Sequence, residues 1–350
     1  MTESLRWLRL SEGALQRDEL SPLLGDRRAQ TNVIVARCEY VLGHWDKALV
    51  SAHSALDLAA DESQLWITAQ AHAISAMVHA GRGNFDVADR HIKRGNQIAA
   101  VVPTVDAVGM TTCARAALAE VKGDSEAVIA ELAVLTRGGG DHLPGSHSLF
   151  FWPTLVAARL DRGDRAGAES ELAALIDSAR RRCLDFRMQI HWLNARIAGL
   201  DGDSTRADVE YAAAVESETT DQLVLDRAAM RRDYGMFLRA NRRRRAATEQ
   251  FAIARRVLSD AGAFPYLRAV DSTITGGAGI PESADPDSAL SILTDRERDV
   301  VVLAADGQTN KEIAAGLYVS VKAVEYHLGN AYAKLGVHSR RDLKGVVHRK

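Results

Sequence analysis

Residues 309–327 read TNKEIAAGLYVSVKAVEYH and contain two helical patterns joined by only three residues, 318–320. In each pattern the apolar residues recur three or four positions apart, which places them on one helix face. They are Ile313, Ala314 and Leu317 in the first helix, and Val324, Leu328, Ala331 and Leu335 in the second. Two amphipathic helices joined by so tight a corner predict helix-turn-helix geometry.

Start and stop signals around this stretch predict four helices, over residues 295–306, 310–317, 321–335 and 340–347. Two capping boxes and one serine mark helix starts: Thr294 with Glu297, Thr309 with Glu312, and Ser320. Gly307 and Gly336 follow the first and third helices, where a left-handed residue commonly ends a helix.

The segment LTDRERDVVVLAADGQTNKEIAAGLYVSVKAVEYHLGNAYAKLGVHSRRDL, residues 293–343, resembles the LuxR-type (NarL/FixJ-like) helix-turn-helix domain of bacterial transcription regulators along its full length. Matching positions include Gly307, Asn310, Lys311, Glu312, Ile313, Val324, His327, Lys334, Leu335 and Ser339. The resemblance implies that the third helix lies in the major groove of promoter DNA.

The apolar stripe of the third helix fixes which of its residues face DNA. We expect base-reading positions at Lys322, Glu325, Tyr326 and Asn330, while Gly329 offers no side chain. We expect phosphate contacts from Thr309, Lys311, Ser320 and Lys334, with Lys322 as a further candidate. The resemblance places dimerisation on the fourth helix, at Arg340, Leu343 and Val347. The alternative is a helix-turn-helix that packs only against another protein.

A repeat of about forty residues precedes this module. The strings LGHWDKAL, RGNFDVAD, KGDSEAVI and RGDRAGAE place glycines at 43, 83, 123 and 163, and two further copies place Gly202 and Asn241 at the same point. Five positions later come small residues: Ala48, Ala88, Val128, Ala168, Ala207 and Ala246. This period predicts an array of helical hairpins. A left-handed glycine ends one helix, and the small residue lets the next helix approach closely.

The repeats, over about residues 30–270, resemble tetratricopeptide (TPR) repeats, with Gly43, Trp45, Ala48 and Ala55 at the small and aromatic positions. The array also resembles the C-terminal half of the large ATP-binding LuxR regulators related to the maltose activator. Those proteins carry an ATPase, whereas this sequence has no GxxxxGK[ST] motif. A curved array predicts a concave face that binds a peptide, protein or small effector; the alternative is a passive spacer.

Composition divides the chain into an array over residues 1–271, a linker over 272–290 rich in Gly, Pro, Ser and Asp, and a DNA-binding module over 291–350. Residues 291–350 have a net charge of +3, so residues 1–290 carry −5 of the total of −2. This asymmetry is typical of a small nucleic-acid module attached to a larger domain.

The remaining signals concern location and chemistry. Three widely spaced cysteines predict free thiols in a reducing cytoplasm, and the sequence shows no apolar run long enough to span a membrane. No catalytic, metal or cofactor pattern is evident, so we expect no enzyme. We therefore expect an all-α fold, a TPR-like solenoid followed by a four-helix LuxR-type domain. The predicted function is a transcription regulator that forms a homodimer on DNA and contacts RNA polymerase, and the family resemblance implies that it is an activator. The alternative is an adaptor whose DNA binding is auxiliary.

Overall fold

The computed structural model describes residues 28–61, 65–136, 148–182, 184–275, 293, 295–305, 307–317, 321–335, 337, 339, 340 and 343. The chain divides into two compact units, Met1–Gly276 and Gly277–Lys350. All secondary structure in the described ranges is helical, which confirms the predicted all-α fold.

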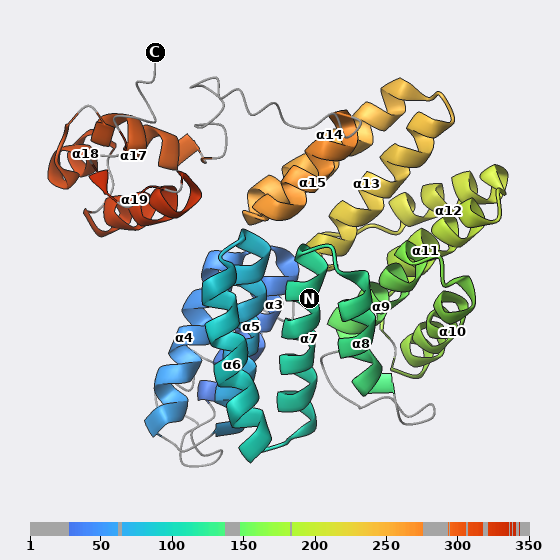
Figure 1. Cartoon of the computed structure of the whole chain (residues 1–350), viewed down its shortest axis with the longest axis horizontal. Coiled ribbons are helices and arrows are strands. Elements are labelled where there is room, and N and C mark those ends of the chain that lie inside the picture. The colour runs from blue at the N-terminus through green and yellow to red at the C-terminus, as the bar shows by residue number, and fades with distance from the viewer. Residues whose placement is uncertain are drawn as a thin grey trace. The chain divides into compact units, whose positions relative to one another are not determined.

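The first unit is an array of helical hairpins, coloured blue to orange in Figure 1. Within each hairpin two consecutive helices pack together, and the first helices of successive hairpins also meet, as α3, α5 and α7 do. The helices are α3 (Arg28–Leu42), α4 (Trp45–Asp61), α5 (Leu65–Arg82), α6 (Phe85–Val101), α7 (Val105–Val121), α8 (Ser125–Thr136), α9 (Ser148–Asp161), α10 (Arg165–Arg182), α11 (Arg187–Leu200), α12 (Ser204–Glu216), α13 (Val224–Ala240), α14 (Arg244–Ala261) and α15 (Phe264–Thr275). The final helix thus extends four residues past the predicted boundary at 271.

The hairpin turns follow the predicted glycine pattern for five repeats. The glycines at 43, 83, 123, 163 and 202 all have a positive φ, between 73° and 84°. In the sixth repeat the prediction was wrong by one residue. Asn241 has a φ of −87°, and Arg242 occupies the left-handed position with a φ of 62°. Accordingly the buried small residue five positions on is Ala247, 2% exposed, and not Ala246.

The small residues of the repeat lie in the core as expected. Ala48, Ala88, Ala168 and Ala207 have no exposed surface, and Val128 has 1%. The aromatic ring of Trp45 is equally buried, and a Cβ placed on Gly81 would lie only 2.5 Å from it. Glycine at 81 therefore lets α5 pack directly onto the indole of α4.

The array also closes on itself, which the repeat pattern did not predict. Helix α15 packs against α5, and the Tyr266 hydroxyl on α15 donates to Glu120 Oε2 on α7 at 3.3 Å. At the first turn, a Cβ on Gly43 would lie 3.1 Å from Cγ2 of Val224 on α13. The start of the array thus meets its end, and the helices enclose an interior.

The second unit contains α17 (Asp295–Ala305), α18 (Asn310–Leu317) and α19 (Val321–Leu335). These bounds match the first three predicted helices to within one residue. Gly307 has a φ of +91° and ends α17 as expected; Gly336 lies outside the described residues. The core is formed by Leu293, Val300, Val301, Ala304, Ala305, Ile313, Ala314, Val324, Leu328, Ala331 and Leu343.

Candidate nucleic-acid interface

Helix α19 has one buried and one exposed face, as its sequence pattern predicts. Val324, Leu328 and Ala331 are at most 4% exposed and pack on α17 and α18. On the opposite face Lys322, Glu325 and Tyr326 are exposed. Gly329 lies on this face with open space around it, and Asn330 is half-buried beside it. The predicted base-reading positions therefore share one accessible surface.

Tyr326 is the large apolar group of this surface. Its side chain is 49% exposed, and its ring meets that of the half-buried His327 edge to face at 5.7 Å between centroids. The contact braces the tyrosine ring without covering it. An exposed ring so placed is suited to pack against a thymine methyl group or to donate to a phosphate.

The start of α18 carries the predicted capping box. The Thr309 backbone N–H donates to Glu312 Oε2 at 2.7 Å, and the Glu312 N–H donates to Thr309 Oγ1 at 3.4 Å. The Thr309 hydroxyl also donates to Glu312, at 2.8 Å. The N–H and hydroxyl of Thr309 together lower the pKa of the Glu312 carboxyl group below its ordinary value. Both donors of Thr309 are thus directed at the cap, in place of the phosphate contact expected from its side chain.

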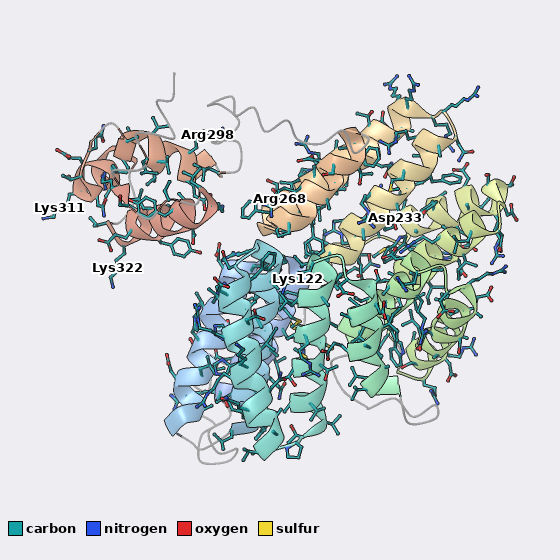
Figure 2. All side chains as sticks on the ribbon, in the orientation of Figure 1. Lys122, Asp233, Arg268, Arg298, Lys311 and Lys322 are labelled. Atoms are coloured by element: carbon teal, nitrogen blue, oxygen red, sulfur yellow. The ribbon has the colours of Figure 1, made fainter. Side chains whose placement is uncertain are left out.

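Lys311 and Lys322 lie at the starts of α18 and α19. Both are exposed, and Figure 2 shows their ammonium groups pointing away from the body of the domain. An ammonium group on a long, free side chain suits phosphate binding, and the positive end of the helix dipole adds to its attraction. Of the predicted phosphate-binding residues, these two have the geometry for the task. Ser320 lies outside the described residues.

Lys334 is placed differently from our expectation. Its Nζ lies 2.5 Å from Glu297 Oε2, and the two side chains are only 16% and 5% exposed. The ion pair joins the end of α19 to α17. Because the ammonium group neutralises a buried carboxylate inside the domain, we remove Lys334 from the phosphate-contacting set. The two residues are 37 positions apart, so no local spacing rule could have paired them.

The expected dimerisation residues are also corrected. Leu343 has no exposed surface and belongs to the domain's own core. Arg340 Nη1 donates to Asn310 Oδ1 at 2.7 Å, and Nη2 donates to the Gln308 carbonyl oxygen. Arg340 therefore braces the start of α18 from within the domain. Val347 lies outside the described residues.

Three features define the second unit as a helix-turn-helix module: the separation of α18 from α19 by only three residues, the capped start of α18 and the exposed face of α19. Residues 291–347 match the family described as bacterial regulatory proteins, luxR family. The C-terminal domain is thus a LuxR-family helix-turn-helix domain, which confirms the resemblance seen in the sequence.

Individual relatives match short parts of this chain. An HTH-type transcriptional regulator of Mycobacterium tuberculosis is 46% identical over 65 residues, which are 19% of this chain and 7% of the relative. A nitrate/nitrite response regulator protein homolog of Haemophilus influenzae is 46% identical over 59 residues, 17% and 28% of the two chains. The transcriptional regulatory protein LiaR of Bacillus subtilis is 40% identical over 57 residues, 16% and 27%. The chain thus spans less than a third of the length of each.

The described residues contain no cluster of three or more His, Cys, Asp or Glu side chains arranged to hold a metal ion. Within the same ranges, no helix is long and apolar enough to cross a membrane. Cys38 and Cys113 are free thiols, and Cys183 lies outside the described residues.

Proposed function

We propose that this chain is a DNA-binding transcription regulator whose helical array binds an effector or partner. The observation that carries the proposal is the exposed face of α19, with Glu325 and Tyr326 at its centre, on a LuxR-family domain. Lys311 and Lys322 hold the phosphates, which set the register of the domain on the duplex. Glu325 reads sequence by accepting a hydrogen bond from cytosine N4.

Several finer properties belong to the same proposal. The regulator acts in the cytoplasm as a homodimer on two half-sites, activates transcription through RNA polymerase, and has no catalytic activity of its own. The family of its C-terminal domain supports a regulatory function, and two-fold binding sites are common among helix-turn-helix proteins.

The test is binding of the full chain to DNA from upstream of its own gene, across a salt series. Each lysine that contacts phosphate releases counterions, so Lys311→Ala and Lys322→Ala should each lower the salt slope by about 1. Lys93→Ala is the matched control, because Lys93 is an exposed lysine of α6 in the array. The proposal fails if the chain shows no salt-dependent binding, or if the control lowers the slope as much.

Base reading is tested separately with Glu325→Ala and a library of randomised sites. Loss of the carboxylate should relax or change the preferred base at one position, worth about 1–3 kcal/mol of discrimination, while non-specific affinity persists. An unchanged preference would remove Glu325 from the reading positions and favour the adaptor alternative, in which DNA binding is auxiliary.

A further inference from the structure

A cavity of about 490 Å³ lies inside the array. Its walls come from α7, α8, α9, α11, α13, α14 and α15, and closure of the array brings the last of these helices to the first. Figure 1 shows α9, α11 and α13 following one another along this part of the array. The volume falls within the range of about 300–1,000 Å³ that is usual for small-molecule sites.

The wall has an apolar part and a polar part of similar extent. The apolar part is formed by short aliphatic side chains on α8, α9, α13, α14 and α15: Val128, Ala157, Ala158, Leu225, Ala228, Ala229, Leu258 and Val270. A surface of this kind binds the hydrocarbon body of a ligand by excluding water. The polar groups of the wall then determine which ligand is accepted.

Four of the charged groups in and beside the cavity balance one another. Arg196 Nη2 lies 2.5 Å from Asp161 Oδ1, and its Nε lies 3.6 Å from Asp233 Oδ2. Arg232 pairs with Asp233 Oδ1 at 2.8 Å, and the Trp192 indole N–H also donates to Asp233, which Figure 2 labels on α13. Two arginines and two aspartates thus form a neutral network. The arginines hold their partners here, which leaves them poorly placed to attract an anionic ligand.

Glu120 differs from this network because its hydrogen-bond partner is neutral. The Tyr266 hydroxyl donates to its carboxylate, and the accessible surface of Glu120 faces the cavity. A second carboxyl group, that of Asp226, accepts from the Gln189 side-chain amide at 3.1 Å. Glu120 and Asp226 together line a smaller cavity of about 20 Å³ that adjoins the large one at Leu225. Burial raises the pKa of each carboxyl group to about 7. Glu120 is nevertheless exposed to solvent, and within the described residues it forms no ion pair with an arginine or lysine.

We propose that the cavity binds a small amphipathic organic cation, whose ammonium group pairs with the Glu120 carboxylate while its apolar body packs on the aliphatic wall. The proposal deepens the effector part of the proposed function and rests on it. The positive charge opposite the Glu120 carboxylate comes from the ligand, because the two arginines of the wall already neutralise two aspartates. An ion pair between ligand and protein adds affinity when its geometry satisfies both groups, and it disfavours ligands that place a negative charge beside the carboxylate.

The experiment measures binding of matched compound sets to the full chain by isothermal titration and thermal shift. Each set shares one apolar body and differs in charge: 2-phenylethylamine, 2-phenylethanol and 3-phenylpropionate, then tryptamine, tryptophol and indole-3-propionate. We expect the amines to bind at least tenfold more tightly than the alcohols and carboxylates. The inference is overturned if the alcohols or carboxylates bind as well as the amines, or if no amine binds at about 10 mM, a concentration that detects even weak affinity.

A pair of variants locates the site. Glu120→Gln keeps the size of the side chain and removes its charge, and it should lower amine affinity about tenfold while leaving alcohol affinity unchanged. Glu126→Gln is the control, because Glu126 is an exposed acid on α8 that pairs with Arg162 at the surface. Equal effects of the two variants, or no effect of Glu120→Gln, would overturn the assignment. If Glu120→Gln does not fold, the preference of the unmodified chain for amines over alcohols and carboxylates still tests the proposal.

DNA binding is measured on the same preparations, so the two proposals can fail separately. A chain that binds DNA but no amine contradicts the cavity ligand alone. A chain that binds amines but not DNA contradicts the proposed regulatory function, and the cavity site stands as that of another kind of binding protein.

Discussion

Arg242 shows how one residue can depart from an otherwise regular repeat. It holds a φ of 62°, where the five preceding repeats have glycine. A side chain in the left-handed region costs about 1 kcal/mol, because its Cβ crowds the backbone. The sequence prediction chose Asn241 because asparagine tolerates this conformation better than arginine. The hydrogen bond from the Arg242 N–H to the Arg239 carbonyl, equivalent to that from Gly202 to Gly199, sets the actual register.

Replacing Arg242 by glycine should therefore stabilise the array. We expect the free energy of unfolding to rise by about 0.5 kcal/mol, since relief of the strain exceeds the added freedom of the unfolded chain. Chemical denaturation followed by circular dichroism measures the change. Arg242→Ala is the control, because it removes the same exposed side chain and keeps the Cβ. A gain of equal size in both variants would mean that charge, and not backbone strain, is responsible.

Asp226 is the residue for which pH dependence is expected. Burial raises its pKa from the ordinary value of 3.8 to about 7, so the folded state holds this proton where the unfolded state has lost it. Its contribution to stability is present at low pH and is lost as pH rises toward 7. Between about pH 5.5 and pH 8 the unmodified chain should lose about 2 kcal/mol more than Asp226→Asn does. Thermal unfolding at the two pH values tests this, and parallel losses in the two proteins would contradict it.

At the scale of elements, the ion pair between Lys334 and Glu297 fastens α19 to α17. Lys334→Ala should destabilise the C-terminal domain by about 3 kcal/mol, because it removes the ammonium group that neutralises a buried carboxylate. The unfolding transition of this domain measures the effect, and the salt slope of DNA binding should stay unchanged below the transition. If Lys334→Ala lowers the slope by about 1 and leaves stability intact, Lys334 is a phosphate contact after all.

The elements themselves were the most predictable part of the structure. Helices α17, α18 and α19 lie within one residue of the predicted ranges because capping signals and apolar periodicity act locally. The same local signals also predicted which face of α19 is exposed. The dimerisation role of Arg340 and Leu343 was expected from the family resemblance and not from local signals. Local signals also do not reveal their contacts within the domain, since Arg340 meets Asn310 at 30 positions' distance and Leu343 joins the core.

At the scale of the whole molecule, closure of the array gives equivalent turns different environments. Gly43 and Gly163 have φ values of 82° and 73° at the same point of the repeat. A Cβ on Gly43 would meet Val224 at 3.1 Å, whereas a Cβ on Gly163 would meet nothing within 4 Å among the described residues. The turn at 43 is thus a packing contact of the closed array, while the turn at 163 faces open space.

A matched pair of substitutions tests this closure. Gly163→Ala should cost about 1 kcal/mol of unfolding free energy, the strain of the left-handed turn, whereas Gly43→Ala should cost about 2 kcal/mol because the contact with α13 must also shift. Denaturant unfolding measures both. Equal costs would indicate that the first turn does not pack against α13 in solution.

The sequence by itself determined the local structure: hairpins with a period near forty residues, left-handed turns, and a helix-turn-helix module with its exposed face. Each depends on residues that are close in the chain, where caps, glycines and apolar spacing act directly. Only the tertiary structure decided that the array closes, that Tyr266 reaches Glu120 across 146 positions, and that both line one cavity. The repeat pattern describes how one hairpin meets the next. The small rotation between hairpins, added over six of them, determines whether the last meets the first.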